Sequence, residues 1–433
     1  MRVRAYDLAM NDPADVPDDL AAAAPGGDAT PDAAGLEVEL EVELEEEEAG
    51  RHATNLELFF DLVFVFAVSQ LSRLIATDIS GVGVAKSALV AWIVWSLWSQ
   101  FSWLGTSVDL DRDAPTRLAF ISSIFPTLFL AISIPDAYGA NGPQFGLAVL
   151  AGTVWVLGLQ GLGLWGDERT RWPFLQYASF AGVAPVLIAV GGFVDGDARI
   201  ALWVVASVVG IAGTFAANRQ RSSDAAADAT ADAATSWRID PVHFAERHGL
   251  FVIIVLGEVL VDIGVAAGEH DLTLPVAWAI LASAFLASVL WWGYFAFIAR
   301  FGEEGLRLGH GVERARLARD FFTFGHFPLV VGVAFLASVV EHVVSHPTAH
   351  LDTDRRWLLL TAVVLVVGSF LGLQFRLRRR LAEERVAAVG IVAVLLATVG
   401  TQASGTVVVA LVALVLAVMQ TITVVRVGAL SAG

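Results

Sequence analysis

Carboxylates embedded in apolar sequence are the groups of this chain with the clearest capacity for chemistry. Glu57 and Asp61 stand four residues apart in the run Glu57-Leu-Phe-Phe-Asp-Leu-Val-Phe-Val-Phe. On a helix this spacing places both side chains on one face, a turn apart. A charged group inside a membrane segment usually faces protein, a partner group or water. The pair is therefore a candidate proton or cation site; alternatively, Asp61 is an acid at headgroup level or a partner for Arg247 or His248.

A second apolar run carries Glu246, His248 and Glu258. If a helix enters the membrane at Glu246, Glu258 lies about 18 Å deeper, near the midplane. A carboxylate at that depth must be paired, hydrated or protonated. Glu258 is thus the leading candidate for a proton carrier or cation ligand, and the alternative is a hydrogen-bonded acid that only packs helices. His248, near the edge, is a candidate site residue or a histidine that caps or pairs.

His326 is a third candidate, in the run Phe321-Phe-Thr-Phe-Gly-His-Phe-Pro328. Pro328 lacks a backbone N–H and can leave the carbonyl of Phe324 free, so polar groups concentrate there. With Glu258, His326 would form an acid and base pair along a proton path. The alternative is a structural histidine.

Long apolar segments must position these residues. Hydrophobic residues make up 56% of the 433-residue chain, above the roughly 45–50% of soluble domains. The segments have the length of about 20 residues that a helix needs to cross a bilayer. The sequence therefore predicts an all-α, polytopic membrane protein with twelve spans, at 57–76, 82–104, 117–135, 145–165, 174–193, 199–217, 246–267, 274–299, 320–343, 356–375, 386–402 and 404–425.

Composition also indicates the boundaries of the parts. Residues 1–52 are rich in Ala, Asp, Pro and Glu and predict a disordered, acidic cytosolic tail. The alternation of acidic and apolar residues within it could instead form a strand on a partner. A first set of six spans is expected at 53–217, a cytosolic linker at 218–245 and a second set of six spans at 246–425.

The two sets of spans resemble each other weakly. Asn55-Leu-Glu-Leu-Phe-Phe-Asp-Leu is echoed by Phe244-Ala-Glu-Arg-His-Gly-Leu-Phe, which places Glu57 opposite Glu246. Six is an even number, so the two copies would share one orientation in the membrane. Glu258 falls opposite Ser69, so the copies are polar at different depths. This asymmetry favours one shared site over two equivalent sites.

Arginines predict the orientation. If the amino terminus is cytosolic, the basic residues fall on the cytosolic side, apart from Arg73, Lys86, Arg199, Arg355 and Arg356. The positive-inside rule therefore places both termini in the cytosol, and we expect a multi-pass protein of the plasma membrane.

Several classes of function are disfavoured by what the sequence lacks. There is no cysteine, which excludes disulfides and thiolate sites. A net charge of −17 disfavours nucleic-acid binding and is typical of the acidic surfaces of halophilic proteins. Metal binding is not expected at His342, His346 and His350, because Pro347 interrupts their helical spacing. Without a phosphate loop, nucleophile elbow or zinc helix motif, we expect neither an enzyme nor a cofactor.

The opening Glu57-Leu-Phe-Phe-Asp-Leu-Val-Phe-Val, together with Glu246-Arg-His-Gly-Leu-Phe-Val-Ile-Ile-Val-Leu-Gly-Glu258, resembles the low temperature requirement protein A (LtrA) family of bacterial and archaeal membrane proteins. The resemblance covers roughly residues 52–425 and leaves out the acidic tail. It implies a membrane protein, but the family is named for a phenotype and brings no catalytic residues to carry over.

These observations favour a membrane protein that binds a small solute or ion between its halves and transports it, coupled to protons. The expected partners are membrane lipids and that solute or ion. The expected site residues are Glu258, Asp61, His326, Glu57, Glu246 and His248. The alternative is a non-transporting sensor or scaffold for low-temperature or stress adaptation, in which these acids only pack helices.

Overall fold

The computed structural model describes residues 51–164, 168–227, 239–378 and 382–431. By its contacts the chain divides into Met1–Gly50 and Arg51–Gly433. The predicted acidic tail, up to residue 50, and residues 228–238 of the predicted linker lie outside the described residues. Within them the secondary structure is helical, apart from an isolated antiparallel bridge between His350 and Ser404.

The elements before the linker are α4 (Asn55–Thr77), α5 (Gly81–Ser107), α6 (Ala114–Ser122), α7 (Ile124–Ser133), η1 (Ile134–Asp136), α8 (Gly142–Leu164), α9 (Glu168–Ala181), α10 (Val183–Gly192) and α11 (Asp197–Ala227). We call these the first half.

The elements after it are α12 (Pro241–Gly268), α13 (Leu274–Gly293), η3 (Tyr294–Ile298), α14 (Ala299–Leu308), α15 (Gly311–Leu317), η4 (Ala318–Phe324), α16 (His326–Ser345), α17 (Thr353–Arg378), α18 (Glu383–Ala397), η5 (Val399–Thr401) and α19 (Gly405–Ser431). We call these the second half.

Eleven helical segments among the described residues are long and apolar enough to cross a membrane. The stretch predicted as a span at 174–193 is divided between α9 and α10, and its apolar part is a shorter helix, Tyr177–Gly192. The predicted class, an all-helical protein with many membrane spans, is confirmed.

Local sequence explains where the two helices that carry the candidate acids begin. Thr54 and Glu57 form a capping box at the start of α4, in which each side chain accepts a hydrogen bond from the other residue's backbone N–H. Asp240 caps α12, and Pro241 occupies its first position, where a missing N–H is tolerated. The helix therefore begins at Pro241, five residues before the predicted start at Glu246, and takes in His243.

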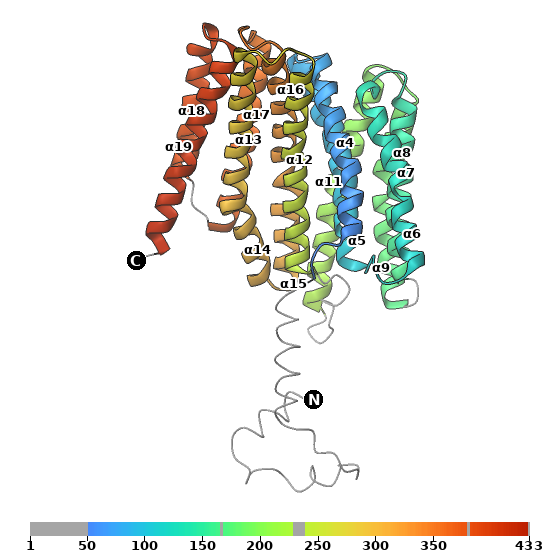
Figure 1. The fold of residues 1–433 in the computed structure, drawn as a ribbon. Helices are drawn as coiled ribbons and strands as arrows, with labels where there is room; N and C mark the ends of the chain where they lie inside the picture. Colours follow the sequence, from blue (N-terminus) through green and yellow to red (C-terminus); the bar gives the residue numbers. More distant parts are fainter. Residues whose placement is uncertain (1–50, 165–167, 228–238, 379–381, 432–433) are drawn as a thin grey trace, which may run out of the picture. The chain divides into compact units, whose positions relative to one another are not determined.

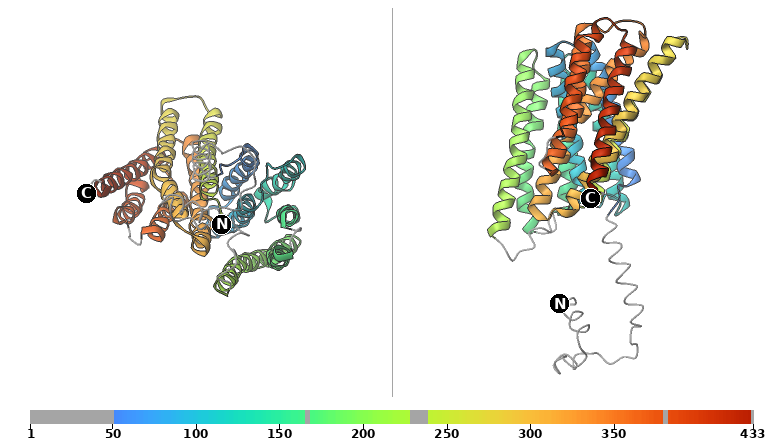
Figure 2. Two further views of the ribbon diagram at one scale, coloured as in Figure 1. Left: turned by 90° about the horizontal axis from the view of Figure 1, so that it is seen from below. Right: turned by 90° about the vertical axis from the view of Figure 1, so that its left-hand side faces the viewer.

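The halves meet through α4 and α5 of the first half and α12 and α16 of the second. Figures 1 and 2 show these helices side by side in the bundle. Apolar side chains such as Phe64, Trp98 and Phe251 are buried along this seam. The candidate residues of the two halves can therefore meet where α4 and α12 begin, which we call the Glu57 end.

Two segments of the second half, η3 and η4, are π-helical. Such segments are rare and occur frequently at functional sites. In η4 the backbone N–H of Gly325 donates to the carbonyl of Asp320, five residues earlier. The π-helical segments matter here because η4 places Thr323 at the seam between the halves, while η3 places Tyr294 next to His326.

Candidate functional site

A fully buried group of ionisable side chains joins the halves at the Glu57 end. Arg247 of α12 donates from Nη1 to Glu57 Oε1 at 2.5 Å and from Nη2 to Asp61 Oδ1 at 3.0 Å. His243, one turn earlier on α12, lies 2.9 Å from Glu57 Oε2 through its Nε2. Each of these four residues is at most 1% exposed. We call Glu57, Asp61, His243 and Arg247 the ion network.

Neutral donors hold the two carboxylates in place. The indole N–H of Trp98, on α5, donates to Asp61 Oδ1 at 2.9 Å. The backbone N–H of Thr54 donates to Glu57 Oε2 at 3.0 Å as part of the capping box. The second oxygen of Asp61, Oδ2, is buried without a hydrogen-bond partner. Asp61 therefore has one acceptor oxygen that no described residue contacts through a hydrogen bond.

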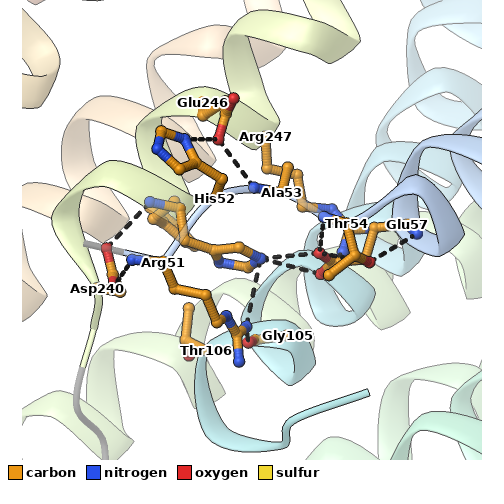
Figure 3. A network of polar contacts seen from close by, with 12 residues as sticks. Arg51, His52, Ala53, Thr54, Glu57, Gly105, Thr106, Asp240, Glu246 and Arg247 are labelled. Carbon is orange, nitrogen blue, oxygen red and sulfur yellow. Dashed lines mark hydrogen bonds and ion pairs between the residues drawn. The ribbon is translucent and has the colours of Figure 1, made fainter. Parts of the chain in front are cut away.

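The segment that leads into α4 lies across the start of α12 (Figure 3). The backbone N–H of Arg51 donates to Asp240 Oδ2 at 2.7 Å, and its guanidinium donates to the carbonyl of Gly105. Glu246 accepts from the backbone N–H of Ala53 at 2.8 Å and lies 3.0 Å from Nδ1 of His52. Glu246, predicted as a site residue, thus ties this segment to α12 and stays outside the ion network.

The electrostatics of the ion network depend on both halves. Its two carboxylates come from α4, while Arg247 and His243 come from α12. In a low-dielectric interior such charges are stable only while paired, and removing one partner leaves an uncompensated charge. Protonation of a carboxylate, or competition by another cation, would therefore weaken the contact between the halves.

His248 and His326 lie together further along the seam, with ring centroids 5.5 Å apart. Nδ1 of His248 donates to the carbonyl of Phe244 at 2.8 Å, and Nδ1 of His326 donates to that of Phe321 at 2.9 Å. The hydroxyl of Tyr294 then donates to Nε2 of His326 at 2.8 Å. Both donor and acceptor of His326 are thus satisfied, with Tyr294 rather than Glu258 as its side-chain partner. Nε2 of His248 remains buried without a partner.

Thr323 of η4 gathers three side chains from one face of α5. Its hydroxyl accepts from Trp103 Nε1 at 3.0 Å and from Ser99 Oγ at 3.3 Å, and its carbonyl accepts from Trp95 Nε1 at 2.7 Å. Trp95 and Trp103 are therefore part of the contact between the halves, as hydrogen-bond donors.

Glu258 lies apart from the ion network, in the second part of α12. It is 8% exposed, and within the described part of the chain its carboxylate makes no hydrogen bond or ion pair. The charged groups that act on the neighbouring Asp262 are Glu258, Glu341 and Arg73. A group of three acids with one arginine therefore occupies the far part of the seam, away from the Glu57 end.

Two cavities lie along the seam. One, of about 20 Å³, is wholly apolar and is lined by residues that include Trp98, Phe251 and Val331. The other, of about 170 Å³, lies at the opposite end of α4 and is lined by residues that include Glu341 and Arg355. The described residues contain no group of three or more His, Asp or Glu arranged to hold a metal ion.

The helices that build this site match a known family. The sequence profile of the bacterial low temperature requirement A protein (LtrA) matches residues 52–425. The chain belongs to the LtrA family. An uncharacterised protein of Rhizobium meliloti (strain 1021), RA0937, is 32% identical over 298 residues, which are 67% of this chain and 69% of that protein. No solved structure matches the chain.

In this LtrA protein the structure brings together Glu57 and Asp61 and, separately, His248 and His326. Glu246 and Glu258 join neither group. Asp61 was expected to be either a site residue or a partner of Arg247 or His248, and it does pair with Arg247. His243 was missed because the predicted span began after it. The signal that could have found it is Asp240-Pro241, a cap followed by proline at the first helical position.

A substitution at Gly105 of α5 can test how tightly the ion network is packed. A Cβ at this position would contact Glu57 Oε1 and lie 3.1 Å from Cε1 of His243. We expect Gly105→Ala to reduce the free energy of unfolding by about 1–3 kcal/mol, because the buried carboxylate has no room to move. Denaturant titration in detergent, followed by circular dichroism, measures this change.

Gly264→Ala, on α12, is the matched control. A Cβ there meets nothing within 4 Å, so the helix should gain up to about 1 kcal/mol from the better helix former. Equal effects of the two substitutions would contradict the close packing of Gly105 against the network.

Proposed function

We propose that this LtrA protein is a transporter that moves a small solute or ion across the membrane by alternating access, coupled to protons, without catalysing a reaction. The observation that carries the proposal is the ion network, in which two buried carboxylates of one half contact a histidine and an arginine of the other half. A buried ion pair is weak evidence for stability and well suited to a switch. Protonation of Glu57 or Asp61 would release α4 from α12.

The helix packing supports two related halves that move as units. In the first half the spans pair as α4 with α5, α4 with α7, α5 with α8, α5 with α11, and α8 with both α7 and α10. The corresponding spans of the second half pair in the same way, as α12 with α13, α12 with α16, η3 with α17, α13 with α19, and α17 with both α16 and α18. Two six-span repeats of one orientation are thus part of the proposal.

Polar groups at both ends of an apolar seam also support transport. The ion network lies at the Glu57 end, and Glu258, Asp262 and Glu341 lie beyond the small apolar cavity. In this arrangement Glu258 accepts protons on one side and the ion network responds on the other. The arginine distribution favours a cytosolic Glu57 end, with both termini on that side and the protein in the plasma membrane.

One observation favours the alternative of a non-transporting sensor or scaffold. The cavity of about 20 Å³ in the seam is apolar and far smaller than a solute. Transport therefore requires the seam to open, whereas a sensor could work by small changes in helix packing.

Proton flux into reconstituted vesicles tests the role of Glu258. Vesicles that contain a pH-sensitive dye are supplied in turn with Na⁺, K⁺, Ca²⁺ and small zwitterions. The wild-type protein should move protons in response to at least one of them, and Glu258→Gln should abolish the movement, because the amide cannot carry a proton.

Glu269→Gln is the control for that substitution. Glu269 is the exposed residue that caps the same helix, and the variant should keep wild-type flux. Full flux with Glu258→Gln would remove Glu258 from the mechanism. Sealed vesicles with folded protein and no proton movement under any condition would favour the sensor.

A further inference from the structure

Arg385, in the first turn of α18, is a buried cation that forms no ion pair with any described residue. It is 1% exposed, and its Nε and Nη1 atoms are buried without hydrogen-bond partners. Within the described residues its guanidinium has one contact of note, with the ring of Phe370, whose centroid is 5.6 Å from Cζ. Burial of an unpaired charge is strongly unfavourable. The side chain therefore indicates a missing anionic partner.

The adjacent acid does not supply that partner. The carboxylate of Glu384 accepts from Arg426 Nη1 at 2.8 Å and from the hydroxyl of Thr423 at 3.4 Å. Glu383, the residue before it, is exposed. Within the described residues neither acid forms a hydrogen bond or ion pair with Arg385, so its guanidinium keeps free donors for an anion.

A second unpartnered polar group lies nearby. Gln420 of α19 is 4% exposed, and both its amide nitrogen and its amide oxygen are buried without partners. Gly293 lies against both Gln420 and Phe370, the ring that Arg385 contacts. Unsatisfied buried polar atoms are rare in folded proteins and commonly mark a bound water, ion or ligand. Two such side chains around one ring indicate a site rather than a packing defect.

The position of Arg385 matches the depth of lipid headgroups. It is the third residue of α18, only about 3–5 Å along the helix, and α18 is one of the segments able to span a membrane. Ala382 provides no side-chain cap, so backbone N–H groups of the first turn are free to bind an anion, while Glu383 and Glu384 in the same turn offset part of the positive potential of the helix dipole. α18 packs on α17 and α19 at one edge of the bundle and exposes Val386, Ile391 and Val394 (Figures 1 and 2).

We propose that Arg385 anchors a binding site for a phosphate group at the start of α18. The planar guanidinium has five N–H donors that match the oxygens of a phosphate. Gln420 adds an amide donor, and the exposed apolar face of α18 can hold acyl chains. The phosphate can belong to an anionic phospholipid or be free in solution. This site is separate from the ion network and does not depend on transport.

Thermal unfolding tests the proposal with wild type, Arg385→Met and Gln420→Leu. Each protein is measured in bilayers of phosphatidylcholine alone, in bilayers that also contain phosphatidylglycerol, and in detergent with or without inorganic phosphate at constant ionic strength. Arg385→Met should fold, because it removes an unpaired buried charge, and in phosphatidylcholine it should be at least as stable as wild type.

We expect phosphatidylglycerol to raise the unfolding midpoint of wild type and to leave that of Arg385→Met unchanged. In a titration with phosphatidylglycerol, Arg385→Met should bind the lipid about ten- to a hundredfold more weakly than wild type, because hydrogen bonds to a charged group are lost. Gln420→Leu should lower the affinity less. Arg117→Met is the control, since Arg117 is exposed and paired with Asp111, and it should respond as wild type does.

The two sources of phosphate are distinguished by which compound, phosphatidylglycerol or inorganic phosphate, raises the unfolding midpoint of wild type. A shift with phosphatidylglycerol alone assigns the site to a lipid headgroup, and a shift with inorganic phosphate assigns it to a free anion. The proposal is overturned if neither addition stabilises wild type, or if Arg385→Met responds as strongly as wild type does.

Discussion

Replacement of Arg247 by methionine is expected to reduce the free energy of unfolding by about 3–5 kcal/mol, the range for breaking a buried ion pair from one side. The guanidinium donates to both Glu57 and Asp61, and its loss leaves two buried carboxylates without their main counter-charge. The measurement is denaturation in detergent, followed by tryptophan fluorescence.

Arg112→Met is the control for this substitution. Arg112 is exposed and pairs with Asp113, so its loss should change the stability by less than about 1 kcal/mol. The triple variant Glu57→Gln, Asp61→Asn, Arg247→Met should recover most of the stability, because no unpaired charge remains. If Arg247→Met alone were as mild as the control, the ion network would not hold the halves together.

A disulfide between Ser99→Cys and Thr323→Cys is expected to lock the halves and reduce transport to the level of empty vesicles. The two hydroxyl oxygens are 3.3 Å apart across the seam, so small side-chain rotations can bring the sulfur atoms into bonding distance. The natural chain has no cysteine. When the disulfide forms, a maleimide reagent can no longer label either cysteine. Because the chain has no other cysteine, this loss of labelling measures the cross-link alone.

Reduction and the single variants provide the controls. A reductant should restore transport in the double variant, and each single cysteine should keep it under oxidising conditions. If the cross-linked protein transported at the wild-type rate, the seam at Thr323 would not open during the cycle. The alternating-access proposal would then lose its support.

The ion network shows which parts of a site a sequence can predict. Glu57 and Asp61 stood out because charges are rare inside apolar segments, and Arg247 was recognised as a possible partner of Asp61. His243 was not recognised, because it was assigned to a loop. Trp98 and Thr323 gave no signal, since indole and hydroxyl groups are common in spans and bond to whatever their helix face meets.

The sequence by itself determined the class of protein, most of the long apolar helices and the LtrA family; the stretch predicted as a span at 174–193 is instead divided between α9 and α10. The class and the helices follow from the length and hydropathy of local segments, because a bilayer requires apolar helices of about 20 residues. The family follows from short sequence motifs. The capping box of Thr54 and Glu57 that begins α4 is also local, but it was not recognised, and the predicted span began two residues after Asn55, at Glu57.

Only the tertiary structure decided which polar groups meet. Asp61 and Arg247 are far apart in the chain, and their helices are apolar on most sides, so periodicity does not reveal which face turns inward. Glu258 was selected for its depth, and Asp262 lies one turn further on the same helix. Only packing brings Glu341 and Arg73 to this pair and gives His326 Tyr294 as its partner. Pairing of buried charges depends on how helices rotate and dock, and that is a property of the whole bundle.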